Sequence, residues 1–295
     1  MTGPVRQVTC IEIGGIPIAL STVDQRFFDL LLERYMGFVS DSRPEFELNF
    51  EITEPRAASN DDVHVHRDGA YWLIERGDFF ARWDSRSGKG SVRQHANPYS
   101  VDSVLRILHT LILAERGGFL LHAASAICNG RAYLFSGVSG AGKTTMTRLA
   151  PPDVTLLTDE ISYVRPGNAS CSNVRTDAEV SYEAFGTPFA GELARSGENT
   201  NGRISALFFL EKGSENRVEE LVPTEAVRRL MRNILFFAED PALVEKLLAS
   251  ACDFVARVPI RRLTFYPDTK VWDEVRRFTS ARVFSAAKEG EAAHV

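Results

Sequence analysis

The sequence has no apolar run of the length that a membrane helix needs, which is about 18 to 20 residues. Its first ten residues also lack the apolar core of a secretory signal, so we expect a cytoplasmic protein that does not enter a membrane. Acidic residues outnumber basic ones, 39 against 34, which gives a formal net charge of −5. Because contacts with a phosphate backbone need a basic surface, we do not expect nucleic acid as a partner.

Cysteine is scarce and scattered, at Cys10, Cys128, Cys171 and Cys252. There is no CxxC pair and no histidine nearby at the spacing of a zinc site, so the sequence favours reduced, structural thiols. His64 and His66 would share one face of a strand, where two imidazoles could bind a metal. No third ligand is evident, and the pattern therefore favours a solvated strand face.

The strongest chemical signal is the stretch GVSGAGKT, from Gly137 to Thr144, which fits the phosphate-loop pattern GxxxxGK[ST]. An apolar, strand-like run precedes it and a helix-compatible run follows it, as this pattern requires. Glycines let backbone N–H groups converge on a triphosphate, Lys143 would contact the β- and γ-phosphates, and the Thr144 hydroxyl is an oxygen ligand suited to Mg²⁺. We therefore predict ATP and Mg²⁺ binding by Gly137, Val138, Ser139, Gly140, Ala141, Gly142, Lys143, Thr144 and Thr145.

Two carboxylates follow the next apolar run. Residues 154–157 (VTLL) predict a buried strand, and Thr158, Asp159 and Glu160 stand at its end. Beside a phosphate loop, such carboxylates are placed to hold Mg²⁺ or to accept a proton from a nucleophile. The alternative is an ordinary acidic strand end, which is common in α/β proteins.

The pattern of apolar residues divides the chain near Asn97. For residues 1–97 the pattern predicts a small α+β N-terminal domain, which is a candidate region for substrate or partner recognition. Residues 98–280 predict the catalytic domain, and residues 281–295 a flexible tail. The main expected elements are a hairpin at 7–13 and 16–20, a helix at 24–35, a strand at 46–52, a meander at 63–66, 70–75, 79–83 and 90–94, a helix at 101–112, a hairpin at 119–128 and 132–136, a strand at 204–210, helices at 224–236 and from 240, a strand at 257–265 and a helix at 268–278.

Two further regions carry candidate site residues. His122 interrupts an otherwise apolar strand that the hairpin brings near the glycine-rich loop, so it could tune Asp159, contact the γ-phosphate, or be a hydrogen-bonded core histidine. Residues 182–203 form the longest polar, glycine-bearing stretch, which predicts either a functional lid or a plain surface loop. Its hinge candidates are Gly186, Gly191 and Gly197, and the side chains that could reach phosphate, metal or substrate are Glu192, Arg195 and Arg203.

Three segments together resemble the catalytic domain of HPr kinase/phosphorylase: residues 119–145, residues 154–164, and residues 182–192 with the run ALFFLEKG downstream. They are more similar still to HPr-kinase-related proteins, which include lasso-peptide kinases. The resemblance covers about residues 117 to 275. It implies an α/β fold of the P-loop, phosphoenolpyruvate-carboxykinase-like kind, with a mixed sheet and helices around it.

The resemblance also implies roles. Asp159 matches the general base that takes the proton of a serine hydroxyl, Glu160 matches the second acid and a Mg²⁺ ligand, and His122 matches the histidine that interacts with the base. Lys143 and Thr144 carry over directly. Glu192, from the glycine-bearing stretch and not from the family motif, is a further candidate metal ligand beside Thr144, Asp159 and Glu160. The acid pair is Asp-Glu here rather than Asp-Asp, and the long glycine-rich segment after the family's acids is not reproduced. HPr as substrate and the phosphorylase reaction therefore do not transfer.

The sequence thus predicts an ATP- and Mg²⁺-dependent kinase that phosphorylates a hydroxyl, with serine of a protein or peptide as the favoured acceptor and Asp159 as general base. Two alternatives stay open: a nucleotide-dependent switch or adaptor without phosphotransfer, and a small-molecule kinase. A decarboxylating carboxykinase ranks last, since its additional metal and oxaloacetate ligands are not found. The sequence does not fix the oligomeric state, and a homo-oligomer stays open.

Overall fold

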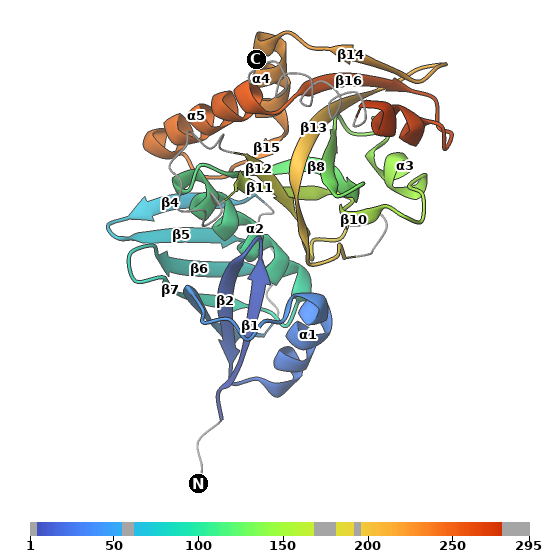
Figure 1. Cartoon of the computed structure of the whole chain (residues 1–295). Helices are drawn as coiled ribbons and strands as arrows, with labels where there is room; N and C mark the ends of the chain where they lie inside the picture. The colour runs from blue at the N-terminus through green and yellow to red at the C-terminus, as the bar shows by residue number, and fades with distance from the viewer. Residues whose placement is uncertain (1–4, 55–61, 168–180, 192–195, 279–295) are drawn as a thin grey trace, which may run out of the picture.

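Two β-sheets with a long helix between them form the protein, which a computed structural model describes over residues 5–54, 62–167, 181–191 and 196–278 (Figure 1). The elements of the N-terminal part are β1 (Gln7–Ile13), β2 (Ile16–Thr22), α1 (Gln25–Tyr35), the 3₁₀ turn η1 (Met36–Phe38), β3 (Phe46–Ile52), β4 (His64–Asp68), β5 (Tyr71–Arg76), β6 (Phe79–Asp84) and β7 (Lys89–Gln94). Those that follow are α2 (Pro98–Glu115), β8 (Phe119–Cys128), β9 (Arg131–Ser136), α3 (Lys143–Arg148), β10 (Thr155–Thr158), β11 (Ile161–Pro166), β12 (Tyr182–Phe185), β13 (Asn201–Lys212), β14 (Arg217–Glu220), α4 (Pro223–Asn233), β15 (Ile234–Leu235), α5 (Pro241–Arg257) and β16 (Ile260–Phe265).

The N-terminal sheet has the strand order β1-β2-β3-β7-β6-β5-β4 within the described residues. Its two local predictions are confirmed: β1 and β2 form a hairpin across Gly14-Gly15, and β4 to β7 form an antiparallel meander. Strand β3 lies between the hairpin and the meander and pairs parallel with both, with β2 on one side and with β7 on the other. Asp24 caps α1, because its carboxylate accepts the backbone N–H of Phe27 at 2.8 Å.

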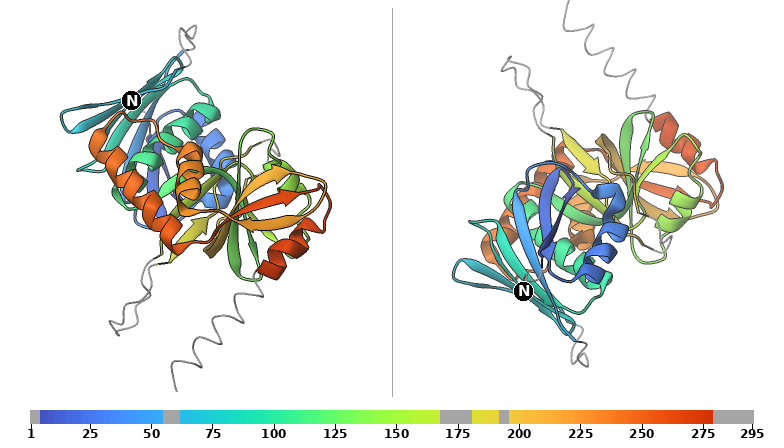
Figure 2. Two further views of the ribbon diagram at one scale, coloured as in Figure 1. Left: turned by 90° about the horizontal axis from the view of Figure 1, so that it is seen from above. Right: turned by 90° about the horizontal axis from the view of Figure 1, so that it is seen from below.

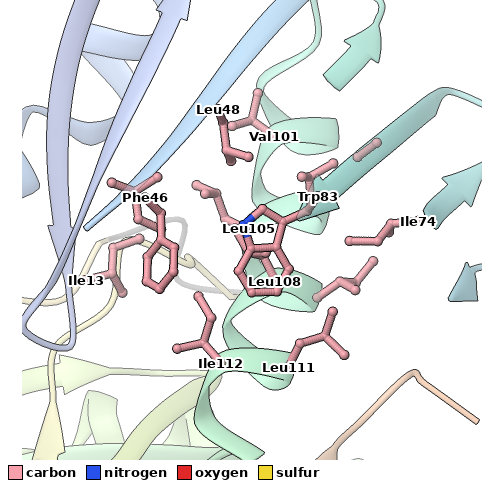
Figure 3. Packing of buried hydrophobic residues seen from close by; sticks show 14 of the residues in the cluster. Ile13, Phe46, Leu48, Ile74, Trp83, Val101, Leu105, Leu108, Leu111 and Ile112 are labelled. Carbon is pink, nitrogen blue, oxygen red and sulfur yellow. The ribbon is translucent and has the colours of Figure 1, made fainter. Parts of the chain in front are cut away.

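Helix α2 begins at the predicted break, where the Asn97 side chain accepts the N–H of Tyr99 at 3.0 Å. Its apolar face packs on the N-terminal sheet, with Leu105 and Leu108 against Trp83 and with Val101 near Leu48 (Figure 3). The same buried cluster includes Tyr163 of β11, so it extends from the N-terminal sheet to the second sheet. Seen from above and from below, the two sheets lie side by side (Figure 2).

The second sheet mixes parallel and antiparallel pairs, which agrees with the mixed sheet that the family resemblance implied. The long strand β8 pairs antiparallel with β9, and β9 pairs parallel with β13. Strands β11 and β12 connect the other end of β8 with the beginning of β13, so the pairings form a closed circuit. The hairpin predicted at 119–128 and 132–136 is confirmed: Asn129 and Gly130 lie in the turn between β8 and β9, and both have positive φ angles, 51° and 70°.

Three sequence predictions need correction. The helix expected to reach residue 236 ends at Asn233, because Ile234 and Leu235 pair instead with Leu121 and Leu120 of β8. Residues 182–203 were expected to lack regular structure, but the two ends of this stretch are strands: β12 at its beginning pairs antiparallel with the start of β13 at its end. The last strand begins at Ile260, because α5 continues through Arg257. In each case long-range pairing or packing overrides the local pattern.

The remaining predictions concern the histidines of β4, the cysteines and the helices. His64 and His66 are both exposed on β4, which confirms the solvated strand face. Cys10, Cys128 and Cys252 are free thiols, whereas Cys171 and the predicted tail at 281–295 lie outside the described residues. None of the helices that the structure describes combines the length and the apolar character needed to cross a membrane.

Candidate functional site

The glycine-rich loop, residues 137–142, connects the end of β9 with α3. Gly140 and Gly142 have φ angles of 76° and 113°, a region that residues with a side chain rarely adopt. A Cβ atom at Gly142 would also lie 2.5 Å from the ring of Phe265, so the core allows only glycine there. The Ala141 side chain is buried in that core and its N–H donates to the Val138 carbonyl at 3.0 Å, which folds the loop on itself.

Lys143 and Thr144 open α3, a helix of six residues. The Lys143 ammonium donates to the carbonyl of Gly137 at 3.1 Å, so the side chain folds back over the loop. Met146 anchors the helix in the core, and the indole N–H of Trp272 donates to its carbonyl at 3.1 Å. Core packing of Met146 and its bond with Trp272 thus fix α3, while Lys143 at the start of this helix lies over the loop.

Asp159 and Glu160 occupy the interruption between β10 and β11, two strands that follow the same edge of β8. The Thr158 hydroxyl accepts the N–H groups of Glu160 and Ile161, at 3.3 and 3.2 Å, and the Glu160 carbonyl accepts the N–H of Ala123 at 2.9 Å. These bonds hold the turn against β8. The pairing register places Ile161 opposite His122, so the turn and the histidine come together.

Asp159 is 3% exposed as a residue, and its carboxylate accepts the N–H of Gly191 at 2.9 Å. A Cβ atom on Gly191 would lie 2.9 Å from an Asp159 carboxylate oxygen and 2.8 Å from Glu160 Cβ, so the backbone packs directly on the two acids. Nearby, the N–H of Thr187 donates to the Leu157 carbonyl at 3.1 Å, and that of Glu198 to the Leu156 carbonyl at 3.0 Å. The described part of residues 182–203, expected to be a lid or a surface loop, is therefore bonded to β10 beside the acids.

The sequence missed Arg106 of α2, which reaches the acids from the other side. Its guanidinium lies 3.3 Å from the Glu160 carboxylate and 5.0 Å from the centre of the Phe189 ring. The Arg106 Nε atom is buried and has no hydrogen-bond partner among the residues that the structure describes. An arginine between the apolar residues Leu105 and Ile107 of a largely buried helix was a signal for such a role, although the sequence alone did not show which element it would face.

Burial and charge shift two pKa values in this site. Burial raises the pKa of Glu160 and the neighbouring Asp159 charge adds to this rise, while Arg106 opposes it. Burial also lowers the pKa of His122, and the positive charges of Lys143 and Arg106 lower it further. His122 is therefore neutral at pH 7, and one of its ring nitrogens can accept a proton or a hydrogen bond.

One cavity of about 260 Å³ gathers most of the predicted site residues. It is lined by Lys212, which the sequence did not single out, and by His122, Ser139, Gly140, Gly142, Lys143, Thr144, Thr145, Asp159 and Glu160. Gly137 and Val138 lie along an adjoining groove instead. Arg203 lies in β13, opposite Glu183 of β12, and Glu192 and Arg195 fall outside the described residues.

The donors and acceptors of this cavity fit a triphosphate with Mg²⁺. Two ammonium groups, three hydroxyls and two carboxylates line it together with two glycines whose positive φ angles shape the loop. Among the described residues no group of three or more His, Cys, Asp and Glu side chains converges as a metal site. Mg²⁺ bound with a nucleotide needs fewer, because one or two carboxylates, phosphate oxygens and water complete its shell.

The family model described as SynChlorMet cassette protein ScmC matches residues 94–280, which is more than half of the chain. The matched segment begins just before α2 and contains both Arg106 and the complete cavity. No curated protein matches the sequence.

Proposed function

We propose that this chain, which belongs to the family of the SynChlorMet cassette protein ScmC, is an ATP- and Mg²⁺-dependent kinase. It would transfer the γ-phosphate to a hydroxyl, with serine of a protein or peptide as the favoured acceptor. The observation that carries this proposal is the shared cavity, where Lys143 and Thr144 lie with Asp159 and Glu160. The proposed fold is that of the HPr-kinase-like P-loop kinases, supported by the glycine-rich loop that follows β9 and by the mixed pairing of β9 with β8 and β13.

In this proposal the loop binds ATP through its backbone and through Lys143. The ammonium group leaves the Gly137 carbonyl, its partner in the structure, and contacts the β- and γ-phosphates. The Thr144 hydroxyl and the carboxylates of Asp159 and Glu160 would hold Mg²⁺, which neutralises charge that develops on the phosphates. Arg106 orients Glu160 from α2 and limits the repulsion between the two acids.

Asp159 would act as the general base. Its carboxylate takes the proton of the acceptor hydroxyl while the hydroxyl oxygen bonds to the γ-phosphorus, and the bond from that phosphorus to the β–γ bridging oxygen breaks to release ADP. The amide of Gly191 holds one oxygen of the carboxylate, which fixes its direction. Neutral His122, in the same cavity, is placed to contact the base or the γ-phosphate without adding charge.

The test is transfer of label from γ-labelled ATP to peptides encoded by neighbouring genes, with intact mass as a second readout. Asp159→Asn should reduce transfer by a factor of about 10² to 10⁴, the usual contribution of a general base, and leave ATP affinity within a few-fold. Asp153→Asn is the matched control, because Asp153 is exposed and pairs with Arg276 away from the cavity. Equal rates for Asp159→Asn and the control would exclude Asp159 as the base.

One observation favours the switch or adaptor as a second candidate. Asp159 is a buried residue whose carboxylate already accepts a backbone N–H, so bound nucleotide could act by moving the Gly191 segment rather than by phosphotransfer. In that case Lys143→Ala should abolish binding of a partner protein, and no phosphorylated acceptor should form. ATP binding with neither transfer nor turnover would support this candidate over the kinase.

A further inference from the structure

A second and larger hollow adjoins the cavity of the glycine-rich loop. It has a volume of about 670 Å³, within the range of roughly 300 to 1,000 Å³ that is usual for ligand clefts. His122 and Ser139 line both hollows, so the two meet beside the loop. The far wall of this groove, which we call the α4 groove, is formed by one side of α4 and by Ile234 and Leu235 of β15.

Three arginines of α4 line the groove: Arg228, Arg229 and Arg232. Arg229 is held by two carboxylates, those of Glu225 at 2.7 Å and Glu211 at 2.8 Å. Arg228 pairs with Glu225 as well. Glu225 and Glu211 are thus shared between several cations, and they leave the wall with an excess of positive charge.

Arg232 supplies that excess. It is exposed in the last turn of α4 and makes no ion pair or hydrogen bond within the described part of the chain. The protein as a whole carries a net charge of −5, so an acidic ligand would gain nothing from its overall field. An arginine with no ion-pair partner among the described residues, beside a groove that leads to the glycine-rich loop, is a local exception to that field. Its guanidinium matches the geometry of a carboxylate.

We propose that the α4 groove binds the acceptor, and that the acceptor is a peptide with a carboxylate side chain close to the hydroxyl that is phosphorylated. The inference rests on the proposed kinase function. Arg232 would pair with the acidic side chain, and the partly buried Ile234 and Leu235 would contact the chain beside it. The hydroxyl would enter past His122 and Ser139, toward Asp159. An acidic peptide matches both parts of the lining, the three arginines of α4 and the apolar side chains that include Ile234 and Leu235.

The probes are two fluorescent peptides, one with a serine flanked by glutamates and a twin with glutamines in their place. Binding is measured by fluorescence anisotropy with a non-hydrolysable ATP analogue and Mg²⁺, and label transfer is measured in parallel. Arg232→Gln should weaken binding of the glutamate peptide by about fivefold, the upper range for an exposed ion pair, and Arg232→Lys should regain most of the affinity. Binding of the glutamine twin should not change.

Arg26→Gln is the matched control, since Arg26 is an exposed helix arginine that has no ion partner among the described residues and lies on α1. Equal binding of both peptides to the wild type, or an Arg232→Gln variant that binds the glutamate peptide normally, would overturn the inference. A loss of affinity for the ATP analogue in Arg232→Gln would do the same, because it would assign the groove to the nucleoside. Binding that depends on Arg232 but is never followed by transfer would leave the groove assignment standing and refute the kinase.

Discussion

The ion pair between Arg106 and Glu160 gives a prediction that does not depend on any ligand. Its N···O distance is 3.3 Å, and the side chains are 23% and 32% exposed. On the N-terminal sheet Arg93 and Glu51 are separated by the same 3.3 Å, but their side chains are 63% and 61% exposed. The two pairs therefore differ mainly in their burial, which makes the second a matched control for the first.

The expected magnitude follows from the geometry. At 3.3 Å and an effective dielectric constant of about 20, the attraction alone is about 5 kcal/mol. Desolvation and the remaining exposure offset most of it, so we expect a net coupling of about 1–2 kcal/mol for Arg106 and Glu160. For Arg93 and Glu51 we expect at most about 0.5 kcal/mol.

Double-mutant cycles with Arg106→Gln and Glu160→Gln, and with Arg93→Gln and Glu51→Gln, measure both couplings by urea unfolding. The pH dependence has a defined sign. Because the folded-state pKa of Glu160 is raised above 4.5, ionisation of this carboxylate destabilises the fold as the pH rises through that range. Removing Arg106 raises the pKa further, so Arg106→Gln should lose more stability than the wild type between about pH 4 and pH 7.5.

The coupling of Arg106 and Glu160 should accordingly be present at about pH 7.5 and vanish near pH 4, where the carboxylate is protonated. A coupling that equals that of Arg93 and Glu51, or one that is the same at both pH values, would refute the reasoning. Either result would mean that Arg106 acts on this turn through its contact with Phe189 rather than through charge.

Three further predictions concern stability. Burial lowers the pKa of His109 from 6.5 to about 3, so as the pH falls the imidazole is protonated in the unfolded chain before it is in the folded one. The free energy of unfolding should therefore decrease by up to about 1.4 kcal/mol per pH unit between pH 6.5 and about 3. His109→Gln should reduce this slope when urea unfolding is measured across that pH range. A Cβ atom at Gly197 would lie 1.6 Å from the Leu157 carbonyl oxygen, so Gly197→Ala should cost about 1–3 kcal/mol, whereas Gly37→Ala, with open space around it, should be nearly neutral in the same thermal melts. Asp240→Ala should cost about 1 kcal/mol in urea unfolding, because the Asp240 carboxylate caps α5 by accepting the N–H of Leu243 at 3.0 Å, and an unchanged midpoint would contradict this capping role.

Features set by neighbouring residues could be predicted from the sequence. The Gly14-Gly15 and Asn129-Gly130 turns specify their hairpins, because positive φ angles are available there. The caps at Asp24, Asn97 and Asp240 mark where helices begin. The candidate site could be predicted as far as its residues lie on the loop, on the β8–β9 hairpin or at the end of β10, since these follow one another closely in the chain.

What the sequence could not provide depends on contacts between distant segments. The pairing of β15 with β8 required the free edge of β8, which no local pattern in Ile234 and Leu235 reveals. The parallel pairs of β3 leave no periodic signal that distinguishes them from antiparallel ones. The approach of Arg106 to Glu160 joins residues that are 54 positions apart and depends on how α2 turns over the N-terminal sheet.

The position of α2 changes how the two parts of the protein should be understood. The boundary expected near Asn97 coincides with the start of α2, but the apolar face of this helix is buried on the N-terminal sheet while Arg106 faces the acids of the cavity. The Tyr163 ring of β11 packs edge to face on His109 of α2, and Arg165 donates to the Gly14 carbonyl at 2.8 Å. A displacement of the N-terminal sheet would therefore move α2, and with it the charge that opposes the raised pKa of Glu160. Because this coupling passes through packed side chains, the N-terminal sheet is a structural support of the candidate site as well as a candidate surface for partners.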